Sequence, residues 1–97
     1  MTINKTQNGS AVTLVIEGRL DTMTSPDLEK ELQTITDSKE LIIDCAKLDY
    51  ISSAGLRVLL SAHKAFSAKD GMTVTNVQDA VLDVFDVTGF KEILNIK

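Results

Sequence analysis

The 97-residue chain has few of the residues on which several classes of protein depend. It contains no Trp, and aromatic residues make up only 4% of it, so its core must consist mainly of Leu, Ile and Val. Its single cysteine, Cys45, excludes an internal disulfide and favours a reducing compartment. No apolar run approaches the roughly 20 residues that span a membrane, and the first residues lack the apolar stretch of a signal peptide. We therefore expect a cytoplasmic protein without a membrane partner.

Charge and motif content exclude further classes. The formal net charge is −4, and no basic run is present, which argues against nucleic acid as a partner. One His and one Cys without a cluster predict no metal site. A Gly-x-Ser-x-Gly hydrolase motif and the Gly-rich loops of nucleotide sites are absent. Ser53 and His63 would lie about 15 Å apart along one helix. We expect neither an enzyme nor a cofactor.

The hydrophobic pattern predicts one α/β domain over residues 1–97. Asn8-Gly9 is a strong hairpin signal between two strands, so these strands should be antiparallel neighbours. Strands and helices then alternate, which implies βαβ crossovers on one mixed sheet. The expected strands are 2–7, 12–16 with its end near 18–21, 41–43, 72–75 and 93–96, and the expected helices are 25–37, 53–69 and 78–88.

Several details of these elements follow from single residues. Ser25 before Pro26 predicts an N-cap for the first helix, and Gly71 predicts the end of the second. The continuous run 41–43 is typical of a strand covered on both faces, and residues 44–50 should form a short connection. Cys45 and His63 are interpreted as packing residues.

The stretch Tyr50–Leu60 combines a turn of two hydroxyls and a glycine with the start of the second helix. Ser53 is a natural N-cap there. Free backbone N–H groups and the positive end of the helix dipole also favour a negative group at this position. Gly55 would let a partner approach the backbone closely. This turn is therefore the candidate site, with the rest of the chain as its scaffold.

Three segments together resemble the STAS domain, and within it the stand-alone bacterial anti-sigma factor antagonists. They are Gly18-Arg19-Leu20-Asp21, Leu41-Ile42-Ile43-Asp44 and Tyr50-Ile51-Ser52-Ser53-Ala54-Gly55-Leu56. The resemblance implies a protein that binds an anti-sigma factor, itself an ATP-dependent serine kinase, and so frees a sigma factor. Phosphorylation by that kinase would block binding until a serine phosphatase restores it.

The resemblance also implies the site residues. Aligned on Gly55-Leu56, the phosphorylated residue falls on Ser53, with Ser52 as the alternative. The implied partner-binding residues are Asp21, Ser52, Ser53, Ala54, Gly55 and Arg57. Arg57 would pair with a phosphate or a partner carboxylate, or would be a solvated surface residue.

One departure from the family pattern keeps an alternative open. The usual turn reads Asp-Ser-Ser/Thr-Gly-Leu, whereas this chain has Ser52 in place of the Asp. A STAS scaffold that is never phosphorylated, or a signalling or sensing module, is therefore the second hypothesis.

Overall fold

The computed structural model describes residues 1–97 as a mixed five-stranded sheet covered by helices. The strands are β1 (Thr2–Asn8), β2 (Ala11–Leu20), β3 (Glu40–Ile51), β4 (Gly71–Thr75) and β5 (Asn95–Ile96). They lie in the order β1-β2-β3-β4-β5, with β1 antiparallel to β2 and all other pairs parallel. The predicted fold class, with its opening hairpin and mixed sheet, is confirmed.

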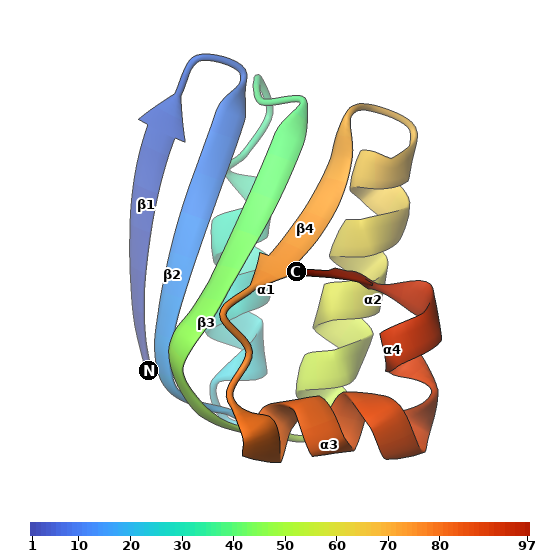
Figure 1. The fold of residues 1–97 in the computed structure, drawn as a ribbon. Coiled ribbons are helices and arrows are strands. Elements are labelled where there is room, and N and C mark those ends of the chain that lie inside the picture. The colour runs from blue at the N-terminus through green and yellow to red at the C-terminus, as the bar shows by residue number, and fades with distance from the viewer.

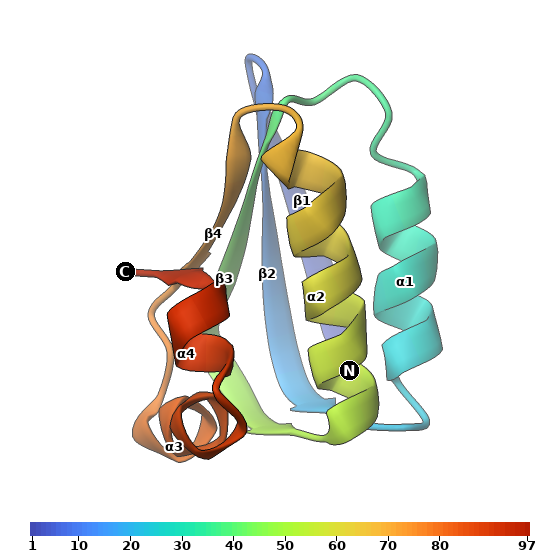
Figure 2. The same cartoon turned by 90° about the vertical axis from the view of Figure 1, so that its right-hand side faces the viewer.

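Four helices complete the fold: α1 (Ser25–Gln33), α2 (Ser53–Ser67), α3 (Asp79–Thr88) and the single turn α4 (Phe90–Ile93). Helices α1 and α2 lie side by side on one face of the sheet (Figure 2). Helices α3 and α4 lie together, and α3 is at the end of the molecule where β3 leads into α2 (Figure 1). No helix is both long and apolar enough to cross a membrane.

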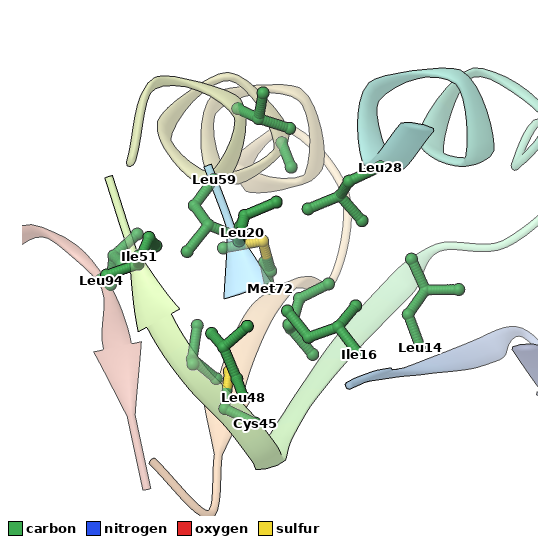
Figure 3. Close-up of a cluster of buried hydrophobic side chains, with 14 of the residues drawn as sticks. Leu14, Ile16, Leu20, Leu28, Cys45, Leu48, Ile51, Leu59, Met72 and Leu94 are labelled. Carbon is green, nitrogen blue, oxygen red and sulfur yellow. The ribbon is translucent and has the colours of Figure 1, made fainter. Parts of the chain in front are cut away.

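The core lies between the sheet and the α1–α2 layer, and Figure 3 shows part of it. Side chains alternate along the strands, so Leu14 and Ile16 of β2 are fully buried while Thr13 and Val15 are only partly covered. The same alternation holds in β3, where Ile42 between Leu41 and Ile43 is partly exposed. The expectation of a strand covered on both faces was therefore wrong.

Strand β3 is longer than the sequence pattern indicated. Residues 44–50, expected to be a connection, continue the strand to Ile51. Two register shifts against β2 each insert one extra residue into β3, which changes the face that the next side chains occupy. Cys45, Leu48 and Ile51 are consequently buried at a spacing of three. A regular strand buries every second residue, so this spacing of three gave no sign in the sequence that residues 44–51 continue the strand.

Several helix and strand ends differ from their predicted positions, and α1 ends at Gln33, four residues before the predicted end at 37. Thr24, not Ser25, is the N-cap of α1, because Ser25 is buried and its hydroxyl donates to the Asp21 carbonyl. Helix α2 stops at Ser67, and Gly71, with φ of 97°, opens β4 instead of capping the helix. The last strand is only β5, since Ile93 belongs to α4.

The two expected packing residues lie in or near the core. Cys45 is fully buried, and burial, together with the nearby Asp44 carboxylate, raises the pKa of its thiol to about 12. The thiol therefore stays protonated at neutral pH. His63 on α2 is partly buried, and its Nδ1 is shielded from solvent without a hydrogen-bond partner.

Leu59→Ala tests the assignment of the α2 face. Leu59 is fully buried (Figure 3), so the substitution should lower the free energy of unfolding by about 2–5 kcal/mol. Chemical denaturation measures this loss, which is large beside the total of about 5–15 kcal/mol expected for a small domain. Val87→Ala, at a side chain 85% exposed, is the control and should unfold at nearly the wild-type denaturant concentration. Equal stability of the Leu59 variant and wild type would contradict the packing.

Candidate functional site

The turn between β3 and α2 is held at the edge of the sheet by Ser52. Its backbone N–H donates to the Leu20 carbonyl at 2.9 Å, which joins the turn to the end of β2. Its hydroxyl accepts from the N–H of Gly55 at 3.5 Å, so Ser52 and not the predicted Ser53 is the N-cap of α2. The reason is that β3 continues to Ile51, which leaves Ser52 with the extended backbone that an N-cap requires.

Ser53 is the first residue of α2 and is exposed. Since Ser52 provides the cap, the hydroxyl of Ser53 has no structural partner in the turn. The first N–H groups of a helix lack partners within it, and the first turn of α2 holds no acidic residue. A negative group on Ser53 would thus meet helix donors and a favourable dipole without a like charge in that turn.

Gly55 is buried because the end of β2 lies directly against it. A Cβ placed on Gly55 would lie 2.7 Å from Cγ of Leu20 and 2.9 Å from both the Leu20 carbonyl oxygen and Cγ1 of Ile51. The space was expected to admit a partner, but the protein's own strands fill it. Gly55 therefore positions the start of α2 against the sheet.

Asp21 lies beside this turn, one residue after the carbonyl that accepts from Ser52. Its Oδ1 accepts from the N–H groups of Met23 and Thr24 at 3.0 and 3.1 Å and from the Thr24 hydroxyl. Partial desolvation raises the pKa of the Asp21 carboxyl, but these hydrogen bonds and the Arg19 charge outweigh it, so the pKa is lowered overall. The ionised carboxylate thus organises the loop between β2 and α1.

Ala54 and Arg57 contribute to a shallow groove between the first turns of α1 and α2, which Thr22 and Glu29 also line. The side chain of Arg57 is exposed. It takes part in neither of the two ion pairs of the structure, which are Lys5–Glu31 and Arg19–Asp21. Being four residues after Ser53, it lies on the same side of the helix.

All six predicted site residues therefore lie around the carboxyl ends of β2 and β3, at one end of the sheet. Sequence reasoning missed Thr22 in the groove and the contact of Arg19 with Tyr50 across β2 and β3. Thr22 lies in an irregular loop that no periodicity describes. Nowhere in the structure do three or more His, Cys, Asp or Glu side chains gather in a way that could hold a metal ion.

Comparison with known proteins identifies the scaffold, since the sequence pattern of the STAS domain matches residues 2–97. The chain belongs to the STAS domain family. BtrV of Bordetella bronchiseptica, provisionally named an anti-sigma factor antagonist, is 33% identical to this STAS domain over 84 residues, which are 84% of this chain and 72% of BtrV.

Two solved proteins share the STAS fold. An anti-sigma factor antagonist from Mycobacterium paratuberculosis has a TM-score of 0.88 at 20% identity, covering 98% of this chain and 83% of that one. SpoIIAA of Bacillus has been solved unphosphorylated and phosphorylated, and each form has a TM-score of 0.76. The unphosphorylated form is 15% identical with coverage of 99% and 87%, and the phosphorylated form 16% identical with coverage of 99% and 91%.

Gly55→Ala tests how closely the STAS site is packed. Because the Leu20 carbonyl is backbone and cannot move freely, the new methyl should shift the start of α2 and cost about 1–3 kcal/mol. This cost exceeds the gain of about 1 kcal/mol in helix propensity. Thermal and denaturant unfolding measure the difference. Ser61→Ala, an exposed position of the same helix, should be neutral or slightly stabilising. A Gly55 variant more stable than wild type would show that the space is open.

Asp21→Asn tests the loop carboxylate through pH. A carboxyl whose pKa is lower in the folded than in the unfolded state stabilises the fold above its unfolded pKa of about 4 and loses this contribution as the pH falls through the folded value. The stability gap between wild type and variant should therefore be widest near neutral pH and shrink in acid. Denaturant unfolding between neutral pH and pH 3 measures the gap; a constant gap would contradict the lowered pKa.

Proposed function

We propose that this chain is an anti-sigma factor antagonist that works by partner switching in the cytoplasm. The unmodified protein binds an anti-sigma factor, which is also a serine kinase, and so releases the sigma factor. The kinase phosphorylates Ser53, binding is lost, and a serine phosphatase restores it. Membership of the STAS family and the names of its relatives support the class of function.

One observation carries the choice of Ser53 as the switch. The two adjacent hydroxyls have different surroundings: Ser52 is partly buried and caps α2, whereas Ser53 is exposed and free. A kinase must bring the acceptor hydroxyl into its own active site, which an exposed side chain allows without unfolding the helix end. The hydroxyl of Ser52 is partly buried and accepts from the N–H of Gly55, so it would have to leave the helix end to reach a kinase.

The other proposed partner-binding residues divide by what they contribute. Ser53, Ala54 and Arg57 present side chains to a partner, and the unpaired Arg57 can bind a partner carboxylate. Ser52, Gly55 and Asp21 support that surface, because the first two fix the helix start and the third fixes the neighbouring loop.

Phosphate would block the partner locally. It adds about −1.5 to −2 charges at the centre of the surface, while the free N–H groups of α2 and Arg57 hold it without rearrangement. The equal TM-scores of this chain to both forms of SpoIIAA support a fold that tolerates the modification. Repulsion from the remaining acidic surface is screened over about 8 Å at physiological salt, so the local donors dominate.

The second candidate is a STAS scaffold or sensing module that is never phosphorylated. The observation behind it is Ser52, a neutral cap where the family pattern has an acid beside the acceptor. Intact-mass analysis after incubation with the cognate kinase and ATP separates the two candidates, because only the switch gains a phosphate.

Ser53→Ala should abolish phosphorylation by the anti-sigma kinase and leave binding to it intact. Fragment-ion mass spectrometry should place the phosphate of the wild type on Ser53. Ser52→Ala is the matched control: it should still be phosphorylated, while losing about 0.5–2 kcal/mol of stability with its cap. Phosphate mapped to Ser52 would overturn the assignment. A folded Ser53→Ala variant that no longer binds would make the hydroxyl a contact as well as an acceptor.

A further inference from the structure

The Asn8-Gly9 pair, which marks the hairpin in the sequence, has no role in the proposed function. Asn8 is the last residue of β1 and pairs with Ala11, so Gly9 and Ser10 form a two-residue turn. Gly9 has a positive φ of 64° and Ser10 does not, which is the pattern of a type II′ turn. The turn lies at the opposite end of β2 from the Ser53 site (Figure 1), about 30 Å away along ten residues of strand.

Two groups that can react with each other are free at this turn. Asn8 and Gly9 are both exposed, and the side-chain amide of Asn8 makes no hydrogen bond in the protein. The backbone N–H of Gly9 donates to no acceptor. Gly9 carries no side chain that would hinder an approach to its nitrogen, and a Cβ built there would meet nothing within 4 Å.

The other three asparagines of the chain have more hindered surroundings. Each is followed by a residue that carries a side chain, namely Lys5, Val77 or Ile96. The side-chain amides of Asn76 and Asn95 also each donate a hydrogen bond within the protein. Asn8 is therefore the one asparagine that precedes a glycine and has its amide free.

We propose that Asn8 is a site of spontaneous deamidation, a known source of asparagine lability. The Gly9 nitrogen attacks Cγ of Asn8, so a new C–N bond forms and the bond from Cγ to Nδ2 breaks. Nδ2 leaves as ammonia with the proton of the Gly9 N–H. Water then opens the cyclic imide at either carbonyl. Opening at Cγ gives an aspartyl residue at position 8, whereas opening at the main-chain carbonyl gives an isoaspartyl residue, in which the chain runs through Cγ.

The fold sets the rate of this reaction. Asn8 has the extended backbone of a strand, so its Cγ meets the Gly9 nitrogen only when the tip of the hairpin opens. The last pair of a strand ladder opens most readily, because few contacts hold it. The reaction therefore proceeds in the native protein without global unfolding, and it needs no partner other than water.

The isoaspartyl product lengthens the main chain by a methylene group at the end of the hairpin. The tip is joined to the segment before β3, because the Ser10 carbonyl accepts from the N–H groups of Lys39 and Glu40 at 2.7 and 3.2 Å. The Gln7 side chain also donates to the buried hydroxyl of Ser38 at 2.8 Å. A longer chain displaces these groups, so the isoaspartyl form should be less stable than the aspartyl form, in which only the charge changes.

Peptide mapping of the purified protein, incubated in native buffer at neutral and at mildly alkaline pH, tests the site. Position 8 should gain the mass difference between NH₂ and OH with first-order kinetics. The rate should rise with pH, because the Gly9 nitrogen attacks after losing its proton. Asn76 and Asn95 are controls within the same samples and should stay intact. Asn8→Gln keeps an amide but would need a larger ring, so it should not react.

A parallel sample in denaturant shows that the assay detects the reaction. If Asn8 deamidates there but keeps its amide in native buffer, the folded hairpin protects the site and the proposal is wrong. Equal rates at Asn8, Asn76 and Asn95 would also contradict it. Neither measurement needs an anti-sigma factor, so the proposal stands or fails independently of the proposed function.

The structural consequence has its own measurement. Ion exchange separates the deamidated forms by their added negative charge, and fragmentation by electron transfer distinguishes isoaspartyl from aspartyl. The isoaspartyl form should unfold at a lower denaturant concentration than wild type, and its Lys39 and Glu40 amides should exchange hydrogen faster. Asn8→Asp, which adds the charge alone, should unfold close to wild type. An isoaspartyl form as stable as wild type would refute the effect of the longer chain.

Discussion

The close contact between Gly55 and Leu20 is the constraint on which the site depends. With no side chain on Gly55, the first turn of α2 can lie against the end of β2, and the Leu20 carbonyl can accept from the N–H of Ser52. Together they fix where α2 begins. A bulkier residue would move the helix start, and with it the cap and the exposed hydroxyl of Ser53. Ser53 is exposed while the residues on either side of the turn, Ile51 and Gly55, are packed.

The surface around Ser53 also has a distinct charge. The chain has a net charge of −4, whereas the unpaired Arg57, four residues after Ser53 on the same side of α2, supplies a guanidinium group beside it. Arginine binds carboxylates and phosphates through the same fork. A phosphate on Ser53 would therefore compete with partner carboxylates for Arg57 in addition to repelling them. Under the proposed function, the phosphate would displace partner carboxylates from Arg57 as well as repel them, and neither effect needs a change of fold.

Residue patterns predicted the elements whose signals are local and periodic. The hairpin at Asn8-Gly9 and the alternation of strands and helices were enough for the fold class. The extension of β3 was missed because its bulges arise from pairing with β2, which no single segment encodes. The predicted N-cap of α2, Ser53, was one residue too late for the same reason. Because β3 continues to Ile51, Ser52 has the extended backbone of an N-cap. The role of Gly55 and the stacking of Arg19 on Tyr50 depend on contacts between distant segments and could not be read from spacing.

Because Cys45 is buried, its reaction with thiol reagents can report on structural opening of this STAS domain. Cys45 carries the only thiol in the chain; it lies within the first bulge of β3, points into the core and is protonated at neutral pH. Alkylating reagents need a solvent-exposed thiolate, so they can reach it only through structural opening. Labelling kinetics would then measure the opening free energy of the strand that leads into the switch turn, without an engineered probe. A partner that clamps this edge would slow the labelling, and its release would restore the rate.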